Sequence, residues 1–278
     1  MNGNPFGRRG RRPASAYVPA VALALLALAL AAPARAQVPD TFVNLKVLPK
    51  NITKAELVET MRGFSSALGV RCQHCHEMKA GSAGAPGGPE PLDFRSDAKT
   101  EKQKARAMLR MVAQINDDLL TKVPSRTDPA IRVQCVTCHH GLKVPRTLED
   151  TLAIALDRAG LAAAVQQYRD LRQRYYGSGV FDFEPPRLIE LSRRLAASKR
   201  APEALEFLKL NTEFYPGDVG SYLAMGDLYL QGGDKAHALE SYRKVLELAP
   251  DNRAAKRRVD ELTRATDGAA RPNGGGRR

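Results

Sequence analysis

The stretch RCQHCHEM, from Arg71 to Met78, holds two cysteines separated by two residues and followed directly by a histidine. A second stretch, VQCVTCHHG from Val133 to Gly141, repeats this arrangement. Together they contain all four cysteines of the chain and four of its five histidines. Disulfides or a tetrahedral zinc site could use the cysteines, but neither needs a histidine after each pair. Covalent haem attachment does, because two thiols bind the porphyrin vinyl groups and the next imidazole binds the iron.

The two motifs therefore predict two c-type haem sites, each with two thiols and one proximal imidazole. The residues are Cys72, Cys75 and His76 for the first haem, and Cys135, Cys138 and His139 for the second. We interpret His74 as a spacer within the first motif and His140 as a solvent-facing neighbour of the second. The remaining histidine, His237, lies far away in a different kind of sequence.

The second axial ligand of each iron decides between electron transfer and substrate chemistry. Met61 lies in ITKAELVETMRGFSSALGV, where Thr53 and Glu56 form a capping-box signature and apolar residues recur at helical spacing. The predicted helix ends near Gly69, just before the first motif, so Met61 could cover the opposite face of that haem. The alternative is a core methionine on an apolar stripe.

A second helix is predicted in KTEKQKARAMLRMVAQINDDLL, where Thr100 and Gln103 again suggest a capping box. Met108 and Met111 lie on nearly the same side of this helix, and spacing alone does not choose between them as ligands. Met78 borders a Gly/Pro-rich stretch and is predicted to lie in a mobile loop, which makes it the weakest candidate.

The motif order is that of a known family. NLKVLPKNITKAELVETMRGFSSALGVRCQHCH, ARAMLRMVAQIN and CVTCHHG, in this order, resemble the cytochrome c subunit of photosynthetic reaction centres over about Thr41 to Pro145. In that family a methionine helix precedes each attachment motif. The resemblance implies Met61 and Met108 as distal ligands of the first and second haem, with Met111 a packing residue and the fallback ligand. The chain has one two-haem half where that subunit has two, so the resemblance implies the haem chemistry but not the photosynthetic role.

The C-terminal half has a different pattern. PGDVGSYLAMGDLYLQGGDKAHALESYRKVLELAPDN carries tetratricopeptide (TPR) signature residues, including the close-packing Gly226 and Ala238 and the closing Pro250. The predicted limits are a signal peptide at 1–36, a dihaem cytochrome module at 37–148, TPR-like helical repeats at 149–265 and a disordered basic tail at 266–278. Within the repeats we expect a degenerate pair at 149–178, repeats at 185–218 and 219–252, and a capping helix at 253–265.

The N-terminus predicts export. A basic segment precedes an apolar run from Val18 to Ala32, and the small-residue site before Gln37 indicates cleavage after Ala36. The run is shorter than the roughly 20 residues of a membrane span; the alternative is a retained anchor. Removing the five arginines of this segment lowers the formal charge from +13 to +8. Such a protein can meet an acidic partner or associate peripherally with an anionic membrane, whereas the mixing of basic and acidic residues argues against nucleic acid.

The sequence thus predicts an all-α protein, with a dihaem c-type cytochrome module followed by a TPR-like α-solenoid. The predicted function is electron transfer between redox partner proteins in the periplasm, with two covalently bound haem c groups and the repeats as a docking region. The protein is not expected to be an enzyme. One alternative is a peroxidase-type dihaem enzyme, which needs an open iron and a distal acid/base group. The other is a TPR assembly factor whose haem only fills the core.

Overall fold

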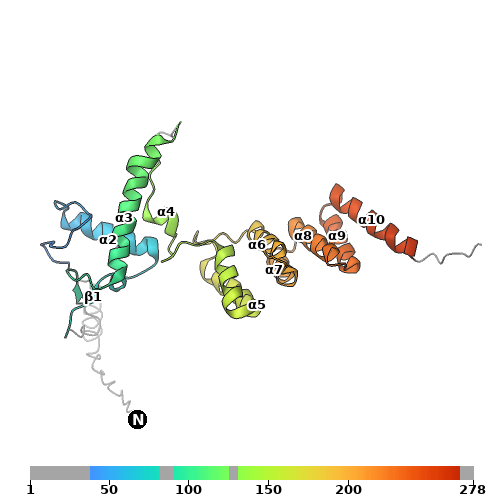
Figure 1. Cartoon of the computed structure of the whole chain (residues 1–278), viewed down its shortest axis with the longest axis horizontal. Helices are drawn as coiled ribbons and strands as arrows, with labels where there is room; N and C mark the ends of the chain where they lie inside the picture. Colours follow the sequence, from blue (N-terminus) through green and yellow to red (C-terminus); the bar gives the residue numbers. More distant parts are fainter. Residues whose placement is uncertain (1–37, 82–90, 125–130, 270–278) are drawn as a thin grey trace, which may run out of the picture. The chain divides into compact units, whose positions relative to one another are not determined.

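The computed structural model describes residues 38–81, 91–124 and 131–269, drawn as coloured ribbons in Figure 1. These residues form two compact units. The first comprises residues up to Ser65 and from Val70 to Val133, and the second comprises Ser66–Gly69 and everything from Gln134 on. The predicted signal peptide and the last nine residues of the predicted tail lie outside the described residues. In the described part of the chain regular structure is helical apart from one pair of two-residue strands, which confirms the all-α class.

Helix α2 (Lys54–Leu68) begins with the predicted capping box. The Glu56 amide donates to the Thr53 hydroxyl (3.3 Å), and the Thr53 amide donates to the Glu56 carboxylate (2.9 Å). These hydrogen bonds from Thr53 hold the pKa of Glu56 below its usual value. The helix ends where Gly69 takes a left-handed conformation with φ +63°, which glycine adopts without steric cost.

Helix α3 (Thr100–Gln114) differs from the prediction at its start. Lys99 is the N-cap residue and no side chain caps the helix, so the capping box predicted from Thr100 and Gln103 is wrong. Thr100 is already the first helical residue, and the Gln103 amide donates to the Asp97 carbonyl instead (3.3 Å).

Short elements complete the first unit. They are a 3₁₀ turn η1 (Cys72–His74), strands β1 (Glu77–Met78) and β2 (Leu92–Asp93), a π-helical turn η2 (Ile115–Leu119) and a 3₁₀ turn η3 (Leu120–Lys122). The strands pair antiparallel, with Met78 opposite Leu92. Met78 therefore lies in a strand, and its predicted place in a loop is wrong.

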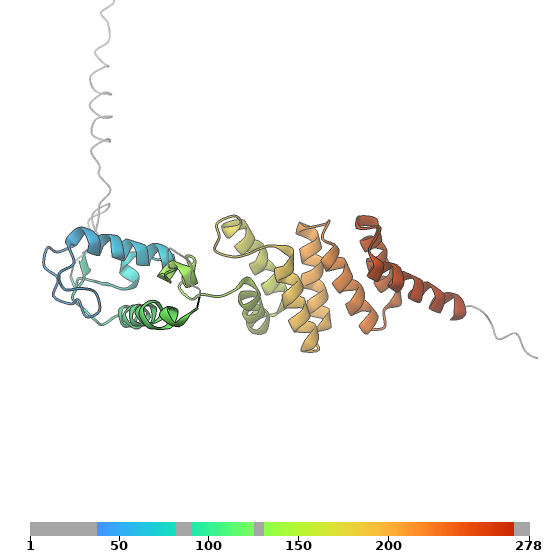
Figure 2. The same ribbon diagram turned by 90° about the horizontal axis from the view of Figure 1, so that it is seen from above.

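The second unit contains the short helix α4 (Cys135–His139) and, after it, a row of helices visible side by side in Figure 2. The helices of the row are α5 (Leu148–Tyr175), α6 (Pro185–Ala197), α7 (Ala201–Phe214), α8 (Val219–Gln231), α9 (Lys235–Leu248) and α10 (Arg253–Ala269). Helix α5 is broken at Gly160 (φ 82°, ψ 176°), which divides it into two helical arms. Helix α10 continues four residues past the predicted end of the capping helix at 265.

The repeats have a packed core of their own. One cluster joins α5, α6 and α7 through Leu152, Tyr168, Leu191 and Phe207, and a second joins α9 to α10. Gly226 shows how close the packing is, because a Cβ placed there would lie 2.7 Å from the Tyr242 ring. None of the helices described is long and apolar enough to cross a membrane.

Candidate functional site

The first cysteine motif forms a tight turn at the end of α2. The Cys75 and His76 amides donate to the Cys72 carbonyl (3.2 and 3.1 Å). Cys72 is exposed and Cys75 is half-buried, and burial raises the pKa of the Cys75 thiol. The turn thus presents two thiols and one imidazole within five residues.

The His76 imidazole is held in an apolar setting. Its ring meets the Phe94 ring edge-on, with centroids 4.8 Å apart. Its Nδ1 atom is buried without a hydrogen-bond partner among the described residues. Burial, followed by the charges of Lys102 and Lys99, lowers the pKa of His76 to about 4. At neutral pH the imidazole is uncharged and able to bind a metal.

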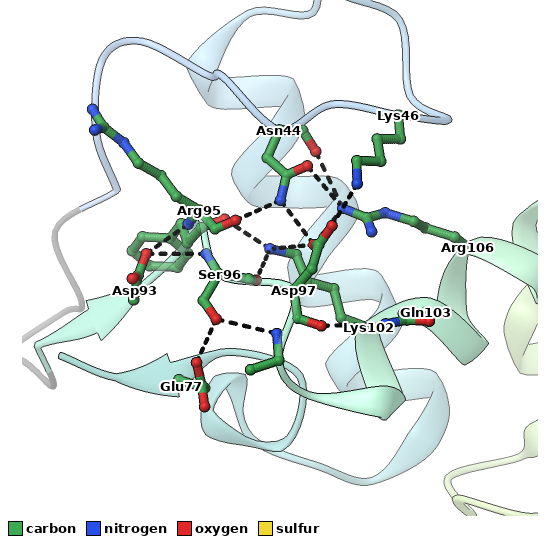
Figure 3. Close-up of polar contacts among 12 residues, drawn as sticks. Asn44, Lys46, Glu77, Asp93, Arg95, Ser96, Asp97, Lys102, Gln103 and Arg106 are labelled. Atoms are coloured by element: carbon green, nitrogen blue, oxygen red, sulfur yellow. Dashed lines mark hydrogen bonds and ion pairs between the residues drawn. The ribbon is translucent and has the colours of Figure 1, made fainter. Parts of the chain in front are cut away.

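A polar network around Asp97 and Lys102, shown in Figure 3, lies beside the segment that carries Phe94. The Lys102 side chain is 12% exposed, and its ammonium donates to the carbonyls of Phe94 (2.8 Å) and Ser96 (2.7 Å). Beside it, the Asp97 carboxylate binds three further groups. They are Arg106 (2.9 Å), Lys46 (2.6 Å) and Asn44 (2.8 Å). Hydrogen bonds from these groups hold the pKa of Asp97 far below its usual range.

The second motif is the short helix α4. The Gln134 amide donates to the Thr137 hydroxyl (3.0 Å) at its start. Cys138 is exposed and Cys135 is half-buried, and burial raises the pKa of the Cys135 thiol. Each motif thus has one exposed and one half-buried thiol, but in the first motif the exposed thiol comes first and in the second it comes last.

The His139 imidazole is oriented by the backbone that follows it. Its Nδ1 lies 2.7 Å from the Leu142 carbonyl oxygen, and the Leu142 amide donates to the His139 carbonyl (2.7 Å). Between them His140 and Gly141 take left-handed conformations. When Nδ1 donates its proton to the carbonyl, Nε2 keeps a free lone pair, which is the usual arrangement of an imidazole that binds a metal.

The positions of the methionines do not single out one distal ligand for the second haem. Met61 is partly buried on α2, while Met108 and Met111 on α3 are 42% and 44% exposed. The structure therefore does not choose between Met108 and Met111. His74 lies in the first attachment turn, and His237 binds Asp234 (2.6 Å) at the start of α9.

Exposed large apolar side chains are concentrated in the part of the chain that carries the motifs. Most of those among the described residues lie between residues 43 and 144. They are Val43, Met78, Met108, Met111, Leu119, Val123, Ile131, Val136 and Val144. All four cysteines are free, and within the described ranges no cluster of three His, Cys, Asp or Glu side chains could hold a metal ion. The thiols, the imidazoles and these exposed apolar side chains suit haem better than zinc or disulfides.

Sequence reasoning missed the groups that hold the imidazoles. The Leu142 carbonyl, Phe94 and Lys102 carry no motif of their own. The only sequence signal for this region was a pair of glycines: Gly69 directly follows α2, and Gly141 follows the second motif. A Cβ on Gly69 would lie 2.1 Å from the Gly141 carbonyl oxygen.

Comparison with known proteins supports the resemblance drawn from the motifs. The family described as photosynthetic reaction centre cytochrome C subunit matches residues 85–176, which confirms the resemblance with different limits. The match includes the second motif and Met108 but begins after the first motif. Cytochrome c-554 of Chloroflexus aurantiacus is 34% identical over 114 residues, which are 41% of this chain and 23% of that protein. The matching family implies covalently bound haem c.

The repeat region matches as well. The tetratricopeptide repeat family matches residues 219–252, the predicted repeat. The Sgt2 TPR domain from Aspergillus fumigatus is 20% identical, with a TM-score of 0.32, and covers 47% of this chain and 86% of its own. The first TPR of Spaghetti (RPAP3), bound to an HSP90 peptide, is 16% identical with a TM-score of 0.31, and covers 43% and 93%. The chain thus combines a cytochrome c region with a TPR region.

Proposed function

We propose that this protein is an exported dihaem c-type cytochrome that carries electrons between redox partner proteins. The observation that supports this best is the orientation of His139, whose Nδ1 faces the Leu142 carbonyl at 2.7 Å and leaves Nε2 for an iron. A second turn of the same composition ends in the uncharged His76. When bound, haem supplies one-electron chemistry.

The chain's own residues attach and orient the two groups. Cys72 and Cys75 would hold the first haem, and Cys135 and Cys138 would hold the second. Met61 and Met108 are the proposed distal ligands, with Met111 as the fallback for the second site. A thioether is a soft, neutral ligand that favours ferrous iron, and its binding would leave no open position for peroxide.

The TPR region is proposed to dock a partner protein. A hollow of about 1020 Å³ runs along α6 and α8, with Ile189, Leu223 and Leu228 among its apolar lining. Arg187, Glu190 and Arg193 also line it, so it offers charge of both signs. Stacked helical repeats commonly bind partners along such concave surfaces. The signal sequence supports a periplasmic location, and the basic charge supports peripheral contact with a membrane.

Haem quantitation on the exported protein tests this proposal. We expect two haems per chain by pyridine haemochrome, two added haem masses, and an N-terminus at Gln37. Low-temperature spin resonance should show two low-spin irons. A colourless protein would refute the proposal, a high-spin iron that reacts with peroxide would favour the peroxidase alternative, and haems that no redox partner reduces would favour the assembly factor.

Replacing single methionines tests the distal ligands. Met108→Ala should change the spectrum of the second haem, whereas Met111→Ala, on the same helix and equally exposed, should leave it unchanged. The opposite result would transfer the ligand role to Met111. Met61→Ala should alter the first haem alone.

A further inference from the structure

The two proposed proximal imidazoles, His76 and His139, have different surroundings. If the protein carries electrons as proposed, this difference sets the direction of electron flow. His139 has a hydrogen-bond acceptor at Nδ1, the Leu142 carbonyl at 2.7 Å. His76 has none among the described residues, although its Nδ1 is buried. An acceptor at Nδ1 makes an imidazole a stronger donor to its metal, which favours the ferric state.

The Leu142 carbonyl is fixed in position. The Gly141 amide donates to the Ala67 carbonyl at the end of α2 (2.8 Å), and the Leu142 side chain packs on the core of the repeats. Gly69 lies against the same turn, because a Cβ at this position would come within 2.1 Å of the Gly141 carbonyl oxygen. A residue next to the first motif thus maintains the turn that orients the second imidazole.

Positive charge gathers at the first imidazole. Lys102 donates to the carbonyl of Phe94, whose ring touches His76, and Lys99 donates to the Gln73 carbonyl inside the motif. Asp97 does not cancel Lys102, because this one carboxylate is shared with Lys46 and Arg106. Nearby cations oppose the additional positive charge of ferric iron.

We propose that these surroundings give the first haem the higher reduction potential and the second haem the lower. With both haems bound, an electron from a donor protein would enter at the second site and pass to the first, so that the second iron would be oxidised from ferrous to ferric as the first is reduced from ferric to ferrous. An acceptor protein would then remove the electron from the first site. Lys102 and Gly69 are the positioning residues that create the difference.

A redox titration of the full haem-loaded chain, followed by optical and spin-resonance spectra, tests this order. Wild-type protein should titrate in two one-electron steps. Lys102→Gln should lower the upper step, with about a tenfold change in its equilibrium constant, or about 59 mV for one electron. Lys102→Arg should retain the wild-type value. Lys104→Gln is the matched control, since Lys104 lies on the same helix, has a side chain that is 72% exposed and forms an ion pair with Glu101 on the helix surface.

Replacing Gly69 tests the surroundings of the second haem. Gly69→Ala should raise the lower step and change the spin-resonance signal of the second haem, whereas Gly63→Ala, which meets no atom within 4 Å, should change neither. If Gly69→Ala does not fold, the Lys102 series still decides the order. Two haems with one common potential, or a Lys102→Gln effect on the lower step, would overturn the inference while leaving the proposed function intact. A chain without two haems would overturn the proposed function itself.

Discussion

The attachment region, which is the described chain before residue 134, and the repeat region, from Leu148 on, obtain their stability in different ways. Among the described residues before 134, Leu57, Ala67 and Leu92 are the only buried apolar side chains. Helix α3 buries no residue at all. From Leu148 to Leu262, by contrast, every helix buries apolar side chains, and these form two clusters; α8 contributes Leu228 alone. A chain region without a core needs another source of stability.

The polar contacts of the two regions also differ, in whether they join segments of the chain or lie on its surface. The attachment region is held by the Asp97 network, in which a partly buried carboxylate joins segment 44–46 to α3. In the repeats, charged pairs such as Arg169 and Glu213 lie on the surface, outside a packed apolar core. We therefore expect bound haem to take the place of a core in the first region, and the repeats to fold by themselves.

The largest effect should come from preventing haem attachment. Replacing all four cysteines by serine removes the covalent bonds, and the region before residue 134 should lose its stable structure. The repeats should keep a cooperative thermal transition, because their core contains no haem. Limited proteolysis and circular dichroism measure the two effects separately. Joint unfolding of both regions would contradict the comparison.

A smaller effect is expected inside the repeat core. Gly226→Ala forces a methyl group toward the Tyr242 ring, which a Cβ would approach to 2.7 Å. Overpacking of this kind should lower the free energy of unfolding by about 1–3 kcal/mol, measured by urea denaturation. Gly217→Ala is the control, because no atom lies within 4 Å of its Cβ position. Equal stability of the two variants would show that the helices shift to accommodate the added methyl group.

The sequence predicted the repeat region well, and physics explains why. Repeats depend on local periodicity and on short-range packing such as that of Gly226 against Tyr242, so the pattern of one 34-residue unit contains most of the information. The family match to 219–252 confirms this. The capping box of Thr53 and Glu56 was predictable for the same reason, since its two residues lie within one helical turn.

The attachment region was harder to predict because its contacts are distant in sequence. The Thr100 and Gln103 pattern predicted a capping box. In the structure Lys99 is the N-cap residue, and the Gln103 side-chain amide donates to the Asp97 carbonyl instead. The Ala67–Gly141 hydrogen bond joins residues 74 positions apart, and no spacing rule reveals it. Motif chemistry predicted the thiols and imidazoles as haem-binding groups, but it did not predict the groups that orient them.

A pH titration sharpens the comparison further. The pKa of Asp97 is lowered in the folded protein, so its contribution to stability is present above the unfolded pKa of about 3.9. That contribution is lost as the pH falls below this value toward the folded pKa. Asp97→Asn should therefore weaken the attachment region at pH 7, and the difference from wild type should shrink as the pH falls through 4. Hydrogen exchange of α3 measures it. A difference independent of pH would assign the effect to shape rather than charge.

The smallest effect should come from the surface of the repeats. Arg169 and Glu213 form two hydrogen bonds (2.8 and 2.7 Å), but their side chains are 42% and 47% exposed. Exposed pairs are screened by water and salt, so Arg169→Gln should cost about 0.2–1 kcal/mol of unfolding free energy. A double-mutant cycle with Glu213→Gln isolates the pair from other changes. A coupling energy well above that range would mean that the repeats, like the attachment region, depend on charge for their stability.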